Sequence, residues 1–228
     1  MDPIQTSRSE RQQVVKCSAS RARRRRRLRL KDSKNNNVWK LLHTNIRGFA
    51  SKKISLDAII NNIKPSVVTI NETKAKSKNN VKIRGFSCFS LNRNCEEGGG
   101  VATCVNNAER FNALKIHEGS KGKEMLVTRH SQFQNPINII NIYGLVESRS
   151  CQDLIDEQWS AIMDQVAKIE ALGEWLILIG DLNSHVGELI NNNKDKISYG
   201  GKLIRDFVMS GDYILVNSTE KNHQRTIY

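Results

Sequence analysis

Residues 175–183 (WLILIGDLN) are the segment that indicates the class of fold most directly. Its first five residues are apolar without interruption, which is typical of a β-strand that is covered on both faces. A glycine, an aspartate and an asparagine follow at once, so this strand ends in residues that can carry chemistry. Open α/β folds place their sites at the carboxyl ends of such strands. Other buried strands that end in polar residues are therefore candidates for the same site.

The preceding sequence alternates between strand and helix patterns. Residues 38–45 (VWKLLHTN) predict a strand that breaks at the following Arg-Gly pair. A helix buried on one side is predicted next, because apolar residues follow the i, i+3, i+4, i+7 spacing at Leu56, Ile59, Ile60 and Ile63. Pro65 stops this helix, and residues 67–72 (VVTINE) predict the next buried strand. Together these elements form a βαβ unit.

The remaining elements indicate a sandwich of sheets and helices. Antiparallel strands are expected at residues 86–91, 101–105, 125–130 and 137–143, where short polar turns connect β-type runs. Helical spacing predicts a helix over residues 153–172, a shorter helix over 202–209 follows, and a strand over 213–217 comes last. Helices that cover both faces of mixed sheets give an α/β sandwich.

Charge divides the 228-residue chain into an arm and a domain. Residues 1–37 hold 12 Lys/Arg against 3 Asp/Glu, a net of +9, which leaves 24 − 20 = +4 for residues 38–228. The arm contains the run Arg23, Arg24, Arg25, Arg26 and Arg27, and we expect it to be disordered, because like charges at this density cannot bury a core. It could bind nucleic acid or direct nuclear import, and a solvated tail without a selected role is an equal alternative.

The lengths of the apolar runs and the number of cysteines indicate the cellular compartment. No apolar run reaches the roughly 18 to 20 residues that a bilayer helix needs. The five cysteines are an odd number without a CxxC pair, which favours a reducing compartment, the nucleus or the cytoplasm, although the Arg and Ser content of the arm leaves a mitochondrial transit peptide as an alternative. We expect Cys88, Cys95 and Cys104 to pack as small apolar groups.

Polar residues that end the buried strands are the candidate site. Asn45 ends the first strand, Glu72 the second and Tyr143 a later one, while Asp181 and Asn183 follow WLILI. Mg²⁺ prefers one or two carboxylates and keeps waters, and Glu72 with Asn45 meets that need. Asp181 could orient or deprotonate a water. The chemistry that this set suits is metal-assisted hydrolysis of a phosphoester.

Five motifs in order resemble those of the endonuclease/exonuclease/phosphatase superfamily, and are most similar to the apurinic-endonuclease-like domains of non-LTR retrotransposons. The motifs are TNIRG (44–48), NETK (71–74), GGGV (98–101), IYG (142–144) and IGDLN (179–183). The resemblance implies a four-layered, DNase I-like α/β sandwich over residues 38–228. It also implies a magnesium-dependent endonuclease, with manganese as an alternative ion, that nicks duplex DNA and belongs to an element that continues into a reverse transcriptase.

The resemblance assigns a role to each candidate residue. Glu72 would be the main metal ligand, with Asn45 beside it. Asp181 would position the attacking water, Asn183 would hold Asp181 and the phosphate, and Tyr143 would contact the scissile phosphate.

The chain also departs from the family pattern. The family usually has Gln at the position of Asn71, Asp or Asn is common at the position of Arg47, and Leu145 replaces a frequent Pro. Family members continue into further strands and a Ser-Asp-His triplet. We therefore expect a domain that is incomplete at its C-terminus and weakly active or inactive.

Two alternatives to this function stay open from the sequence. One is an RNA exonuclease or a phosphatase of the same superfamily, and another is a non-catalytic remnant that binds nucleic acid. Lys74, beside the site, could steer a DNA backbone, but a solvated loop would look the same. No membrane and no obligate protein partner is expected.

Overall fold

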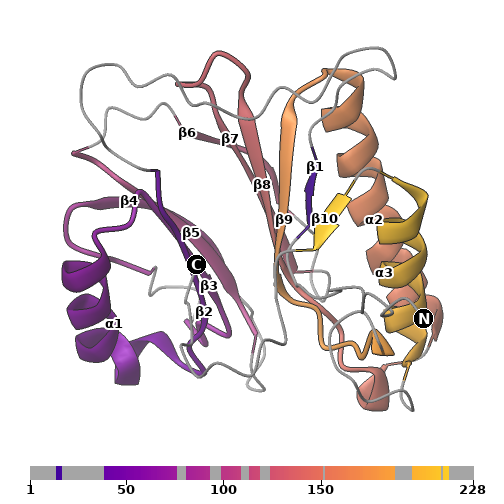
Figure 1. The fold of residues 1–228 in the computed structure, drawn as a ribbon. Helices are drawn as coiled ribbons and strands as arrows, with labels where there is room; N and C mark the ends of the chain where they lie inside the picture. The colour runs from indigo at the N-terminus through magenta and orange to yellow at the C-terminus, as the bar shows by residue number, and fades with distance from the viewer. Residues whose placement is uncertain are drawn as a thin grey trace, which may run out of the picture.

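The computed structural model describes residues 14–16, 39–75, 81–92, 99–108, 113–118, 124–150, 152–187, 197–211 and 213–215. Two β-sheets lie face to face within these residues, and helices cover the outer face of each sheet (Figure 1).

The first sheet has the strand order β2-β3-β5-β4. The strands β2 (Leu41–Asn45) and β3 (Val67–Asn71) are parallel, and helix α1 (Phe49–Ile63) connects them, which confirms the predicted βαβ unit. The strands β5 (Val101–Asn106) and β4 (Phe86–Leu91) complete the sheet in antiparallel pairing. One predicted core residue of α1 is different: Ile59 is 36% exposed, because it lies at the edge of the buried stripe that Leu56 and Ile60 form.

The second sheet has the order β10-β1-β9-β8-β7-β6. Its centre is the parallel pair β8 (Ile137–Tyr143) and β9 (Trp175–Asp181), joined through η1 (Glu147–Arg149) and α2 (Gln152–Ala171). The strand β7 (Glu124–His130) pairs antiparallel with β8. Helix α3 (Tyr199–Ser210) then leads to β10 (Tyr213–Leu215). The uninterrupted apolar run of β9 is buried from Leu176 to Ile179, as its sequence predicts.

Three apolar clusters separate four layers, which confirms the predicted DNase I-like sandwich. The outer clusters pack α1 against the first sheet, and α2 and α3 against the second. The middle cluster lies between the two sheets and includes Val67, Val105, Ile139 and Ile179. Figure 1 shows this order of layers, with α1 on one side and α2 and α3 on the other. Of the helices in the described ranges, none is long and apolar enough to cross a bilayer.

Two strands lie outside the sequence prediction. One is β6 (Ala113–Glu118), which pairs with β7 at the sheet edge. The other is β1 (Val14–Lys16), which lies in the arm that was expected to be disordered and pairs antiparallel with both β9 and β10. The adjacent valines give β1 the β-branched side chains that favour a strand. The arginine run and the other arm residues lie outside the described residues.

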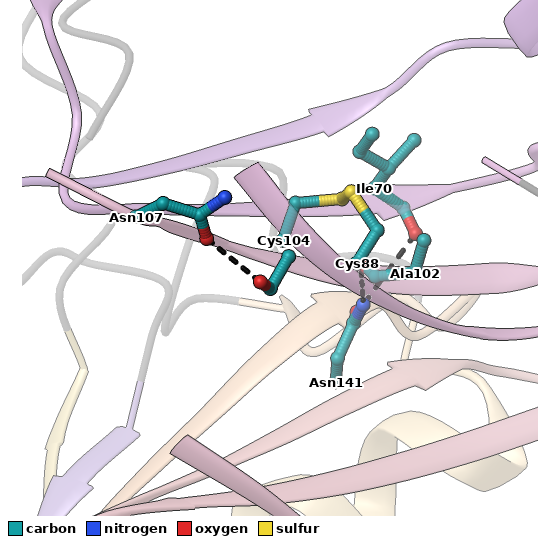
Figure 2. The surroundings of a disulfide bond; sticks show 7 residues. Ile70, Cys88, Ala102, Cys104, Asn107 and Asn141 are labelled. Atoms are coloured by element: carbon teal, nitrogen blue, oxygen red, sulfur yellow. Dashed lines mark hydrogen bonds between the residues drawn. A yellow bond between two sulfur atoms is a disulfide. The ribbon is translucent and has the colours of Figure 1, made fainter. Parts of the chain in front are cut away.

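Cys88 and Cys104 pack in an apolar cluster as expected, but they also form a disulfide that the sequence did not predict. Cys88 of β4 and Cys104 of β5 are direct antiparallel partners with a Cα–Cα distance of 4.0 Å, and they form a disulfide. Figure 2 shows the bond beside the strand residue Ala102. The pairing follows from the register of the two strands, which places both thiols on the face toward α1. Cys95 lies outside the described residues.

Polar side chains tie the two sheets together near the carboxyl ends of β3 and β8. Asn141 of β8 donates its amide to the carbonyl oxygens of Ala102 (2.9 Å) and Ile70 (3.4 Å) in the other sheet (Figure 2). Asn71 of β3 donates to the carbonyl oxygen of Ile142 at 2.5 Å. Buried amides are stable only when hydrogen-bonded, so these contacts fix how the sheets are placed relative to each other.

Candidate active site

The carboxyl ends of two parallel strand pairs, one from each sheet, meet at one place. Asn45 ends β2, and its amide nitrogen donates to Glu72 Oε1 at 2.9 Å and to Asp181 Oδ2 at 2.7 Å. Glu72 follows β3 directly, and Asp181 is the last residue of β9. All three side chains are half-buried. The amide of Asn45 thus joins two carboxylates, one of which lies 136 positions away in the sequence, as the predicted position at the strand ends requires.

Tyr143 completes the cluster from the end of β8. Its hydroxyl donates to Glu72 Oε1 at 3.1 Å. Burial raises the pKa of the Tyr143 phenol, the negative charge of Glu72 raises it further, and a hydrogen bond with Asn183 opposes the shift. The phenol therefore stays protonated at neutral pH and remains a hydrogen-bond donor.

Asn183 holds Asp181 in a different way from the prediction. Its backbone nitrogen, rather than its side chain, donates to Asp181 Oδ1 at 3.1 Å. The side-chain nitrogen donates to the carbonyl oxygen of Gly144 at 2.8 Å. Asp181 is therefore held at both oxygens, by Asn183 and by Asn45.

Strained backbone is concentrated at this place. Five non-glycine residues in the described ranges have a positive φ, and one of them, Lys64, is the C-cap of α1. The other four all border the cluster: Arg47, Glu72, Lys74 and Asn183. Such conformations are costly for L-residues and gather at functional sites, where the surrounding structure holds them. The distribution supports the assignment of this edge as the site.

The donor set fits a hard divalent ion. Two carboxylates and an amide offer oxygen ligands, which Mg²⁺ prefers, and this ion usually takes one or two carboxylates and keeps its waters. Glu72 and Asp181 lie close enough for this, because both accept from the amide nitrogen of Asn45. The Asn45 oxygen accepts from the backbone nitrogen of Arg47, so the amide would have to turn for Asn45 to serve as the predicted ligand. Within the described ranges there is no group of three or more His, Cys, Asp or Glu residues that could hold a metal. Oxygen ligands suit Mg²⁺ or Mn²⁺ better than a metal that needs several nitrogen or sulfur ligands.

Two cations border the site. Arg47 and Lys74 are exposed on the loops that follow β2 and β3. A Cβ at Gly48 would lie 3.9 Å from Cδ of Lys74, so the lysine stem lies over this glycine. Lys74, for which a nucleic-acid contact was predicted, thus lies two residues after Glu72. Residues 23–27, for which the same was predicted, lie outside the described residues.

Two residues near the site were not singled out for it by the sequence. His43 lies on β2, and its Nδ1 is 3.1 Å from Thr69 Oγ1. Burial lowers the pKa of His43 to about 4, and the charge of Asp181 opposes this shift. Gln158 of α2 contacts the backbone beside Tyr143. A spacing signal was present for Gln158, because it lies three residues after Ile155 on the apolar stripe of its helix.

Comparisons with known proteins give likeness in structure alone. No protein-family model matches the sequence, and no curated protein sequence matches it. The catalytic domain of APE2 from Xenopus laevis has a TM-score of 0.56 at 15% identity, over 73% of this chain and 67% of that one. The 3′ phosphatase NExo from Neisseria, solved with product DNA hairpin, has a TM-score of 0.60 at 15% identity, over 76% and 72%.

A retrotransposon protein is similar as well. The endonuclease domain of TRAS1, a telomere-specific non-LTR retrotransposon, has a TM-score of 0.51 at 14% identity, over 75% of this chain and 71% of that one. Identities this low speak for the fold and not for the activity. The chain therefore has the fold of the endonuclease/exonuclease/phosphatase superfamily, as its motifs predict.

Proposed function

We propose that this chain is a metal-dependent phosphodiester hydrolase that nicks duplex DNA, of the type found in non-LTR retrotransposons. The observation that carries the proposal is the convergence of Glu72, Asp181 and Tyr143 around the amide of Asn45. Two carboxylates and a protonated phenol at one point suit phosphoryl chemistry, in which charge stabilisation and alignment supply most of the rate.

Each residue has a defined task in this proposal. Glu72 and Asn45 hold Mg²⁺, which when bound supplies Lewis-acid polarisation of a phosphoryl oxygen. Asp181 accepts a proton from the attacking water, since its two oxygens are already oriented by Asn45 and Asn183. Tyr143 donates its hydroxyl proton in a hydrogen bond to the phosphate. Arg47 and Lys74 attract the DNA backbone beside the site.

DNA as substrate and the retrotransposon class rest on two supports. The five ordered motifs are most similar to retrotransposon endonuclease domains, and the fold is similar to the TRAS1 endonuclease domain. NExo, which has this fold too, was solved with a DNA hairpin. The motif similarity is the stronger support, because it concerns the residues that meet at the site.

The test is nicking of supercoiled plasmid. The protein is used in excess over plasmid, so that even one slow turnover is visible. We expect nicking with Mg²⁺ that EDTA abolishes and that Glu72→Gln and Asp181→Asn each lower by roughly 100-fold or more. The matched control is Asp164→Asn, at an exposed position on α2, which keeps wild-type activity.

Two further substrates separate the alternatives. A poly(A) RNA tests exonuclease activity, and an oligonucleotide with a 3′-phosphate tests phosphatase activity. If Glu72→Gln changes none of these activities, the proposed function is wrong. Salt-sensitive DNA binding without any cleavage would instead support a non-catalytic remnant.

A further inference from the structure

Gln158 is a buried glutamine whose two polar atoms both hold the chain beside Tyr143. It lies on α2 with 5% of its surface exposed. Its Nε2 donates to the carbonyl oxygen of Tyr143 at 3.1 Å, and its Oε1 accepts from the backbone nitrogen of Leu145 at 3.0 Å. The amide therefore brackets Gly144 and satisfies a backbone acceptor and a backbone donor at once.

The turn that Gln158 brackets is connected to the Asp181 loop. The Gly144 nitrogen donates to the Asp181 carbonyl oxygen at 2.7 Å, and the Gly144 carbonyl oxygen accepts from the Asn183 side chain at 2.8 Å. A Cβ at Gly144 would lie 2.4 Å from the Leu182 carbonyl oxygen, so the two segments are in close backbone contact. A displacement of this turn would move Tyr143, Asp181 and Asn183 together.

We propose that Gln158 is a positioning residue that fixes the Tyr143 hydroxyl against Glu72 from outside the site. This inference rests on the proposed function. Tyr143 is the last residue of β8, so beyond its carbonyl oxygen the strand no longer fixes the direction of the chain. Gln158 adds a side-chain clamp from the packed helix at this last pair of the strand. A mutation away from the reacting atoms that misplaces a catalytic group by about 1 Å can lower the rate by about 100-fold.

Helix α2 supplies a matched control for this role. Gln165 lies two turns further along the same buried stripe and is 8% exposed. Leucine at either position removes a buried amide and leaves an apolar side chain that is one bond shorter. Only Gln158 contacts the Tyr143–Leu145 turn, so a role in packing alone predicts equal effects at the two positions.

The kinetic test compares these variants in the nicking assay with plasmid in excess over protein, so that kcat and KM can be measured. We expect Gln158→Leu to lower kcat by roughly 10- to 100-fold with little change in KM, and Gln165→Leu to leave kcat within about 3-fold. In a double-mutant cycle, Gln158→Leu should lose part of its effect when Tyr143→Phe is present, because part of the displacement acts through that hydroxyl. Equal kcat in the two leucine variants, or full additivity with Tyr143→Phe, would overturn the proposal.

A second measurement is independent of activity. Hydrogen exchange at the Leu145 amide, followed by NMR, should be fast in Gln158→Leu and slow in Gln165→Leu, because only the former removes the acceptor. Gln158→Glu keeps that acceptor but turns a carboxylate oxygen toward the Tyr143 carbonyl, so it should keep the protection and still lose kcat. If wild-type protein cleaves nothing, the proposed function fails, and the exchange comparison still decides whether Gln158 holds this turn. Unchanged protection of Leu145 in Gln158→Leu would refute the clamp.

Discussion

Asn45→Asp tests the meeting of the two carboxylates directly. The substitution keeps the size of the side chain but replaces the amide that Glu72 and Asp181 share with a third carboxylate. At separations of about 3 Å and an effective dielectric of about 40, each new repulsion amounts to roughly 3 kcal/mol. The side chains are half-buried and can rotate apart, so we expect a net loss of about 3 kcal/mol from the free energy of unfolding.

The assay is thermal unfolding followed by circular dichroism, in EDTA and in increasing Mg²⁺. In EDTA the midpoint of Asn45→Asp should fall by roughly 6 to 12 °C relative to wild type. Added Mg²⁺ should restore most of this loss, because an ion that binds the folded state stabilises it by mass action and three carboxylates attract it more strongly than two. The unfolding midpoint of wild-type protein should rise less with added Mg²⁺.

The control is Asn107→Asp, which adds the same charge at an exposed position. Asn107 uses its Oδ1 to accept from Ser87 at 2.7 Å, and an aspartate keeps this acceptor. Asn107→Asp should remain within about 1 kcal/mol of wild type and should not gain a response to Mg²⁺. If Asn45→Asp behaves in the same way in EDTA, Glu72 and Asp181 do not meet at Asn45 in solution and the reasoning fails.

Three further predictions concern stability. Gly180→Ala should prevent folding, because the new Cβ would lie 1.9 Å from the Ile142 carbonyl oxygen, while Gly85→Ala, also at positive φ but in open space, should cost only about 1–2 kcal/mol in urea unfolding. Cys88→Ser should lower the free energy of unfolding by about 3 kcal/mol, since the disulfide closes a loop of 16 residues, and a reducing agent should then destabilise wild type but not the variant. Burial lowers the pKa of His130 from 6.5 to about 4. The stability that depends on its neutral ring is therefore present above pH 6.5 and is lost as the pH falls toward 4. Between about pH 7.5 and about pH 5, wild type should lose about 2 kcal/mol more than His130→Gln, and equal losses would show that His130 is not buried as a neutral ring.

The site could be predicted from the sequence because its determinants are local. An uninterrupted apolar run marks a strand buried on both faces, and the residue after it must lie at a sheet edge. This holds for Asp181 after the run in β9 and for Glu72 after β3. Parallel pairing brings such ends together within each sheet, whereas the meeting of the two pairs depends on how the sheets pack and was implied by the resemblance of the motifs.

The parts that the sequence did not predict depend on contacts between distant segments. The disulfide between Cys88 and Cys104 depends on the register of β4 with β5, which a single sequence does not specify. Strand β6 lies at an edge, where Leu114 is 61% exposed, so its apolar pattern is weak. The spacing of Gln158 places it on the buried stripe of α2, but its contact with the turn after β8 depends on how the helix packs against that turn.

The order of the sheets along the chain has a practical consequence. The first sheet uses residues 41–106, and apart from the short β1 the second sheet uses residues 113–215. Each half therefore brings its own share of the polar cluster: Asn45 and Glu72 on one, Tyr143 and Asp181 on the other. A chain divided between Ala108 and Ala113 would give two inert pieces, and cleavage regained on mixing them would measure their reassociation, as in a split-enzyme reporter.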